Sequence, residues 1–159
     1  MSNPRRPPAN GTRRTNRGPS EIAPGIFVGG WKDAEAFQGA RFCVLDELPE
    51  EKVPADRHVP IYDERSDAPI RKNLDELADL VRTAHEGGRP VLMFCGHGVR
   101  RGSLAGAWYL HRVQGIPLDA AYERVRAARP QIEHVKEWVG NWQSLEEPGR
   151  RPAASARRA

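Results

Sequence analysis

The chain lacks the features that secretion or membrane insertion requires. Its 159 residues include only two cysteines, Cys43 and Cys95, which are too few for a disulfide framework. No run of eighteen apolar residues occurs, so we predict no membrane-spanning helix. The N-terminus is charged and has no apolar core, unlike a secretory signal. We therefore expect a cytoplasmic location, where a reactive thiol stays reduced.

Acidic residues are missing from both ends of the chain. The first nineteen residues hold five arginines and no acid, and the last twelve hold four arginines and no acid. The chain has 25 basic residues, so without these nine arginines the region between the two ends holds 16 basic and 21 acidic residues. The central region is therefore acidic, although the whole chain carries a net charge of +4. Such tails are usually disordered and less often contact nucleic acid, an anionic surface or an acidic partner. We expect disordered tails at 1–19 and 148–159 around one domain at 20–147.

The most informative stretch is VLMFCGHGVRRG, residues 91–102. An apolar run at 91–94 predicts a strand, and it leads into a loop that begins at Cys95 and reaches Arg101 six positions later. Helical spacing follows at Leu104, Ala107, Trp108 and His111. A loop that opens a helix presents N–H groups without intrahelical partners and a partial positive charge. Such a loop binds anions, and phosphate is the usual one.

A cysteine at the mouth of such a loop is suited to attack a bound phosphorus. The positive field favours thiolate over thiol and lowers the pKa of cysteines in such settings from about 8.5 to roughly 3.5–7.5. An arginine on the opposite rim binds two phosphoryl oxygens through its planar guanidinium, which lysine cannot do. We predict that Cys95 is the nucleophile of phosphoryl transfer and that Arg101 holds the phosphoryl oxygens. We expect the N–H groups of the other loop residues to share in phosphate binding; these residues are Gly96, His97, Gly98, Val99 and Arg100.

The pattern Cys95-x5-Arg101, with Gly98 between them, resembles the phosphate loop of the cysteine-dependent protein tyrosine phosphatases. It is most similar to the dual-specificity subgroup, and the resemblance covers most of residues 22–145. It implies an α/β fold with a mainly parallel central sheet flanked by helices. It also implies hydrolysis of phosphotyrosine through a phosphocysteine intermediate, with phosphoserine and phosphothreonine left open as further substrates. No metal or other cofactor is needed.

Two positions depart from the pattern of this family. Phe94 stands where the family usually has histidine, and Gly102 stands where it usually has serine or threonine. Because the missing hydroxyl helps the thiolate leave, we expect slow hydrolysis of the intermediate unless Ser103 takes its place. These departures motivate an alternative, a catalytically weak pseudophosphatase that recognises phosphorylated partners. Sulfur transfer is a third hypothesis, although sulfurtransferase loops are typically one residue shorter.

Phosphate ester cleavage also needs an acid that protonates the departing oxygen. Asp63 ends a strand predicted at 59–62, thirty-two residues before Cys95, and this placement resembles that of the general acid in the dual-specificity subgroup. Catalytic groups in open α/β sheets gather at the carboxyl ends of the strands, where Asp63 and Cys95 can meet. Asp67, in the same loop, is the alternative acid.

The remaining pattern alternates short strands with helices, which predicts a mainly parallel α/β sheet with helices on both faces. Besides 91–94, we expect strands at 26–30, 42–45 and 59–62 and helices at 31–37, 73–86, 102–114 and 118–128. Asn73 is predicted to cap the second of these helices. A terminal helix is predicted with an apolar face of Val135, Trp138, Val139, Trp142 and Leu145.

Three side chains have two interpretations each. His97 and Arg100 either point into solvent at the rim of the loop or select a second anionic group on a lipid or nucleotide. Cys43 is either a small core residue or a partner that forms a reversible disulfide with Cys95. We expect a monomer that acts on a phosphorylated protein.

Overall fold

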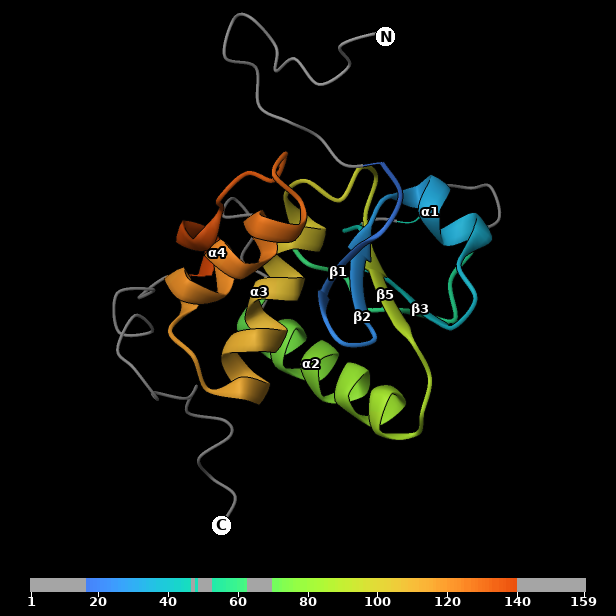
Figure 1. The fold of residues 1–159 in the computed structure, drawn as a ribbon, viewed down its shortest axis with the longest axis horizontal. Helices are drawn as coiled ribbons and strands as arrows, with labels where there is room; N and C mark the ends of the chain where they lie inside the picture. Colours follow the sequence, from blue (N-terminus) through green and yellow to red (C-terminus); the bar gives the residue numbers. More distant parts are fainter. Residues whose placement is uncertain (1–16, 47, 49–52, 63–69, 140–159) are drawn as a thin grey trace, which may run out of the picture.

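The structure is a computed structural model that describes residues 17–46, 48, 53–62 and 70–139. Within these residues, five strands form one sheet in the order β1-β2-β5-β3-β4 (Figure 1). They are β1 (Ser20–Ala23), β2 (Ile26–Gly29), β3 (Ala40–Cys43), β4 (Arg57–His58) and β5 (Val91–Phe94). β2, β5, β3 and β4 run parallel, and β1 pairs antiparallel with β2. The predicted mainly parallel α/β sheet is confirmed.

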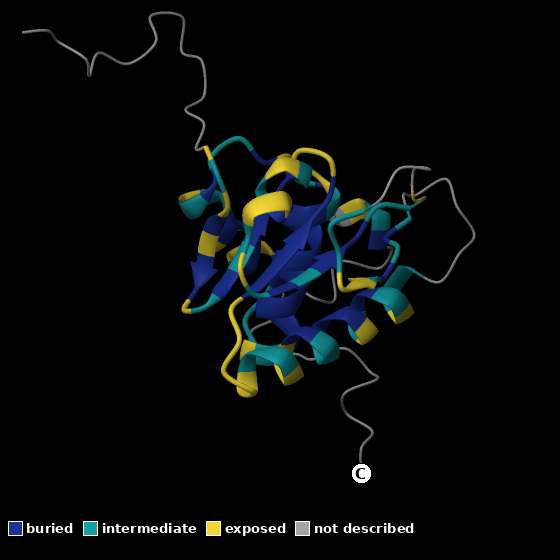
Figure 2. Cartoon of the chain, turned by 90° about the vertical axis from the view of Figure 1, so that its right-hand side faces the viewer, coloured by how far each residue is buried: buried dark blue, intermediate teal, exposed yellow. Residues whose placement is uncertain are grey.

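Helices cover both faces of this sheet, as predicted. They are α1 (Trp31–Ala36), α2 (Ile70–Glu86), α3 (Arg101–Gln114), α4 (Leu118–Ala128) and the 3-10 helix η1 (Lys136–Val139). α2, α3 and α4 lie on one face, and α1 lies on the other (Figure 1). All four residues of β5 are buried, as expected for a central strand covered on both faces (Figure 2).

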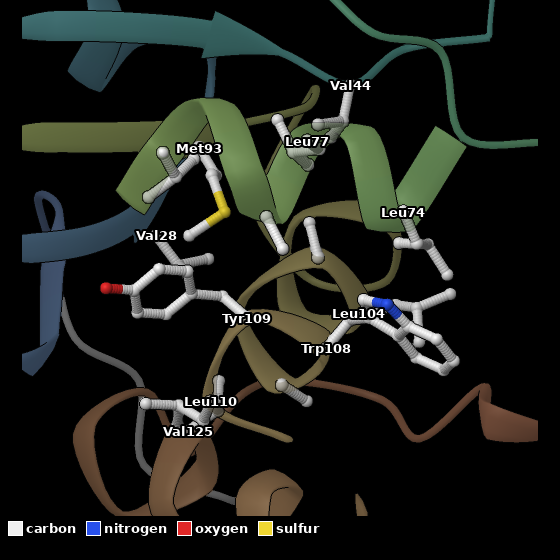
Figure 3. Close-up of a cluster of buried hydrophobic side chains, with 14 of the residues drawn as sticks. Val28, Val44, Leu74, Leu77, Met93, Leu104, Trp108, Tyr109, Leu110 and Val125 are labelled. Carbon is white, nitrogen blue, oxygen red and sulfur yellow. The ribbon is translucent and has the colours of Figure 1, made fainter. Parts of the chain in front are cut away.

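The larger core lies between the sheet and α2 and α3. Figure 3 shows Val28 and Met93 of the sheet facing side chains of both helices, and Leu104 and Trp108 of α3 are fully buried. Truncation of a buried leucine to alanine costs about 2–5 kcal/mol, so Leu104 contributes to holding α3 against the sheet. A smaller cluster on the α1 face contains Ala34, Cys43, Leu92 and Phe94.

The strand predicted at 26–30 is the second strand of a β-hairpin. β1 precedes a turn at Pro24–Gly25, and β2 follows it. Gly25 has φ +80, a left-handed conformation that glycine adopts without a steric penalty. β1 was not predicted, because Ser20 and Glu21 interrupt its apolar pattern.

The strand predicted at 59–62 is wrong. β4 comprises only Arg57–His58, and Val59 and Ile61 add single backbone hydrogen bonds to the end of β3. Pro60 between them has no N–H, so the ladder cannot continue as a regular strand.

The cap predicted at Asn73 is also wrong, because α2 already includes Ile70. The Asn73 side chain instead donates a hydrogen bond of 2.7 Å to the carbonyl of Pro60. It thus ties α2 to the segment after β4.

The helices after the phosphate loop agree with prediction. α4 spans the predicted residues, and α3 begins one residue earlier than expected, at Arg101. The predicted terminal helix is described only as η1, and its residues Trp142 and Leu145 lie outside the described residues. No described helix is long and apolar enough to cross a membrane.

Candidate active site

The loop after β5 lies at the carboxyl edge of the parallel strands, where sites of open α/β sheets form. Two backbone hydrogen bonds fix its start. The N–H of Cys95 donates to the carbonyl of Gly29 at 3.4 Å, and the N–H of Trp31 donates to the carbonyl of Gly96 at 3.0 Å. These bonds therefore attach the start of the loop to the end of β2 and to the first residue of α1.

The sulfur of Cys95 accepts two backbone hydrogen bonds. The N–H of Gly98 lies 3.2 Å and the N–H of Gly102 lies 3.3 Å from Sγ. Gly98 has φ +70, and a Cβ atom there would lie 2.6 Å from the carbonyl oxygen of Gly29, so only glycine fits. The positive ends of two peptide dipoles thus converge on the predicted nucleophile, an arrangement that favours an anion.

A pocket of about 210 Å³ opens above this sulfur. Its lining residues are Leu45, Cys95, Gly96, His97, Val99, Arg100 and Arg101. The structure therefore brings together all predicted loop residues except Gly98, which is buried beneath. His97 and Arg100 are exposed and line the pocket, so both of their interpretations, as rim side chains and as selectors of a second anionic group, stay open.

Arg101 is held at the wall of the pocket by three neighbours. Its Nε donates to the carbonyl of Ile61 at 2.7 Å, and one terminal nitrogen donates to Asp46 at 3.1 Å. The guanidinium carbon also lies 5.6 Å from the ring centroid of Trp138, a cation–π contact. Asp46 was not among the predicted site residues, although its place just after a predicted strand was a signal for it. Trp138 was expected to serve only as core.

The two candidate acids, Asp63 and Asp67, lie outside the described residues. Ile61 is described, and its carbonyl bonds to Arg101. The described chain therefore contacts the phosphate loop at Ile61.

The two departures from the family pattern have different surroundings. The ring of Phe94 is fully buried and packs edge-on against Trp31 with centroids 6.2 Å apart. A Cβ atom at Gly102 would lie 3.5 Å from Sγ of Cys95 and 3.4 Å from Val28, which is ordinary contact. A Cβ atom at position 102 would therefore fit beside the sulfur.

Ser103 does not take over the place of the missing hydroxyl. Its Oγ lies 2.7 Å from the carbonyl oxygen of Val99 and 2.9 Å from that of Arg100. Both acceptors belong to the turn that starts α3. The hydroxyl is therefore engaged by the backbone of the loop.

Cys43 and Cys95 are both free thiols and belong to different buried clusters. Cys43 packs with Phe94 on the α1 face, and burial raises the pKa of its thiol. These surroundings favour the interpretation of Cys43 as a core residue. Among the described residues, no group of three or more His, Cys, Asp or Glu is arranged to hold a metal.

Comparison with known proteins identifies the family. Residues 45–146 match the family model described as dual specificity phosphatase, catalytic domain. Dual specificity phosphatase 28 of Mus musculus is 27% identical over 136 residues, covering 80% of this chain and 81% of the relative. The Homo sapiens protein of the same name is 27% identical over 135 residues, covering 79% of this chain and 76% of the relative.

Solved structures agree on the fold. Human DUSP28 superposes with a TM-score of 0.70 at 23% identity, covering 85% of this chain and 97% of that structure. A mouse putative dual specificity phosphatase complexed with zinc tungstate gives a TM-score of 0.66 at 23% identity, covering 85% of this chain and 90% of that structure. The chain belongs to the dual specificity phosphatase family of cysteine-dependent protein tyrosine phosphatases, which are phosphoric monoester hydrolases.

Proposed function

We propose that the protein hydrolyses phosphotyrosine on protein substrates through a phosphocysteine intermediate on Cys95. The observation that carries this proposal is the pair of N–H groups, from Gly98 and Gly102, that converge on Sγ at the floor of the pocket. They stabilise the thiolate before attack and again when it leaves. The mouse relative complexed with zinc tungstate supports the proposal, because tungstate is a tetrahedral oxyanion like phosphate.

In the first step the Cys95 thiolate attacks phosphorus opposite the leaving oxygen. The S–P bond forms as the P–O bond to the substrate breaks, and Asp63 donates a proton to the departing oxygen. Arg101 contacts the phosphoryl oxygens, as do the N–H groups of the loop. The position of Arg101 at the pocket wall supports this role.

In the second step water attacks the phosphocysteine. The Asp63 carboxylate takes a proton from this water, the S–P bond breaks, and inorganic phosphate and the Cys95 thiolate result. Gly102 supplies only its N–H to the sulfur, so we expect this step to limit turnover. We propose that Asp63 rather than Asp67 is the acid, that no cofactor takes part, and that the protein acts as a cytoplasmic monomer.

The general acid has a direct test. Asp63→Ala should slow hydrolysis of a phosphotyrosine peptide more than that of p-nitrophenyl phosphate, because p-nitrophenolate leaves without protonation. Asp67→Ala is the matched control. A rate loss confined to Asp67→Ala would overturn the assignment.

The departures at Phe94 and Gly102 favour one alternative, a phosphate-recognition module with little turnover. Hydrolysis of p-nitrophenyl phosphate by the wild type, Cys95→Ser and the control Cys43→Ser separates the two functions. The phosphatase proposal predicts turnover that Cys95→Ser abolishes and Cys43→Ser retains. A wild type that binds phosphotyrosine peptide without hydrolysing it would establish the recognition module instead.

A further inference from the structure

A buried arginine from outside the phosphate loop, Arg129, contacts the loop from beneath. Arg129 follows α4, only 5% of its side chain is exposed, and it does not line the pocket. Its Nε donates to the carbonyl of Gly98 at 3.0 Å, and a terminal nitrogen donates to the carbonyl of His97 at 2.9 Å. The other terminal nitrogen donates to the carbonyl of Gly18 at 2.8 Å and to Oγ of Ser20 at 2.9 Å.

These contacts determine which way the peptide groups of the loop face. In a trans peptide the C=O and the following N–H point in opposite directions, and no described bond in the chain is cis. The carbonyl of His97 points down to Arg129, so the N–H of Gly98 points up to Sγ of Cys95, 3.2 Å away. By the same geometry, the carbonyl of Gly98 held by Arg129 directs the N–H of Val99 toward the pocket side of the loop.

Arg129 also places a positive charge under the nucleophile. Burial lowers the pKa of this guanidinium, and the negative charges of Asp33 and Cys95 act against that shift. The carboxylate of Asp33 lies 4.0 Å from Arg129 and accepts the N–H of Gly30 at 2.8 Å. On the pocket side the titratable and charged side chains that line the pocket with Cys95 are His97, Arg100 and Arg101.

We propose that Arg129 is a positioning residue of this phosphatase, which holds the carbonyls of His97 and Gly98 away from the pocket so that the loop N–H groups face the bound phosphoryl group. The inference rests on the function proposed above. Through Gly18 and Ser20 the same guanidinium joins the loop to the start of β1, so the N-terminal segment supports the loop as well.

The test compares Arg129→Met and Arg129→Lys with Arg112→Met. Arg112 is a matched control because its side chain is only 10% exposed and pairs with Asp75 and Asp79, both at 3.3 Å, between α2 and α3. Two readouts need no turnover. One is the affinity for orthovanadate measured by calorimetry, and the other is the pH dependence of Cys95 alkylation by iodoacetamide, followed by peptide mass spectrometry.

We expect Arg129→Met to weaken orthovanadate binding at least about tenfold, because one misdirected oxyanion donor costs about 10²–10³ in rate. Its alkylation profile should move to higher pH, because a positive charge near the thiolate is lost. Arg129→Lys keeps the charge but cannot hold both carbonyls, so its alkylation profile should stay near wild type while its orthovanadate affinity falls. Arg112→Met should lower the melting temperature and leave both readouts unchanged.

Orthovanadate affinity in Arg129→Lys equal to that of wild type would overturn the inference, whether or not Arg129→Met folds. So would equal losses in Arg129→Met and Arg112→Met. The outcomes also separate this inference from the proposed function. A wild type that binds orthovanadate in an Arg129-dependent manner without turnover would refute the phosphatase reaction alone, and turnover with no effect of Arg129→Lys would refute the positioning role alone.

Discussion

Arg101 of the phosphate loop is paired with Asp46, which lies in the segment after β3, with 3.1 Å between the guanidinium nitrogen and the carboxylate oxygen. The side chain of Arg101 is 18% exposed and that of Asp46 is 44% exposed. A pair this accessible contributes little stability, about 0–1 kcal/mol. The pair therefore serves to orient Arg101, because Asp46 and the carbonyl of Ile61 together fix the plane of the guanidinium.

Asp46→Asn should weaken substrate binding without unfolding the protein. The amide keeps the shape of the carboxylate but loses its charge, so Arg101 is less firmly oriented. We expect the KM for p-nitrophenyl phosphate to rise several-fold and the free energy of unfolding to change by less than about 1 kcal/mol. Asp56→Asn, which removes a comparable pair with Arg41 at 3.6 Å, is the control. An unchanged KM in Asp46→Asn would refute the orienting role.

Gly102→Ser should accelerate breakdown of the phosphocysteine. A Cβ atom fits 3.5 Å from Sγ of Cys95, so a hydroxyl there can donate to the departing thiolate. A hydrogen bond to a charged group contributes about 1.5–3 kcal/mol, which corresponds to about 10- to 160-fold in rate. We expect the wild type to show a burst of p-nitrophenol followed by slow turnover, and Gly102→Ser to show faster turnover and a smaller burst.

Gly102→Ala is the matched variant, since it adds the Cβ atom without the hydroxyl. It should keep the slow turnover of the wild type. If both substitutions accelerate turnover equally, helix formation rather than the hydroxyl is responsible.

Phe94→His, which restores the usual residue of the family, should destabilise this protein. The Phe94 ring is fully buried with Leu92 and Cys43 and contacts Trp31, so an imidazole there loses water without an evident partner. An unsatisfied buried polar group costs about 1–3 kcal/mol, which urea denaturation would detect as a lower midpoint. Phe94→Leu, an apolar control, should cost less than Phe94→His. Equal or greater stability of Phe94→His would show that the neighbours of this ring satisfy an imidazole.

Cys43 should resist alkylation while Cys95 reacts. Cys43 is fully buried, and burial raises the pKa of its thiol, so it stays neutral at neutral pH. Because the folded pKa lies above the unfolded one, the stability that this thiol contributes is complete below about pH 8.5 and is lost as the pH rises through the folded value. Iodoacetamide at pH 7.5 should therefore label only the Cys95 peptide, and stability should fall more steeply above pH 8.5 in the wild type than in Cys43→Ala. Labelling of Cys43 in the native protein would contradict this account.

The phosphate loop was predictable because its signals are local. An apolar run, a glycine-containing loop and a helical pattern follow one another between Val91 and Gln114, and the structure forms each element there. The helix at 118–128 had equally clear local signals. The prediction of a strand at 59–62 was wrong because Pro60 has no N–H, so the ladder is interrupted between the hydrogen bonds that Val59 and Ile61 make.

The supports of the loop could not be read from the sequence, because their partners lie far along the chain. Arg101 and Asp46 are 55 positions apart, Arg129 and Gly98 are 31 apart, and Arg129 and Gly18 are 111 apart. No periodicity links such positions, and only the packing of β3, β5 and α4 brings them together. The pairing of Asp46 with Arg101 and the contacts of Arg129 were therefore found only in the structure, although the place of Asp46 just after a predicted strand was a local signal.

The phosphocysteine on Cys95 can be detected by peptide mass spectrometry of the enzyme quenched in acid within milliseconds of mixing with p-nitrophenyl phosphate. The phosphocysteine mechanism predicts a single phosphorylated peptide, with the phosphate on Cys95, that accumulates in the wild type, decreases in Gly102→Ser and is absent in Cys95→Ser. Turnover that proceeds with no phosphate on Cys95 at any time point, or that survives in Cys95→Ser, would contradict it.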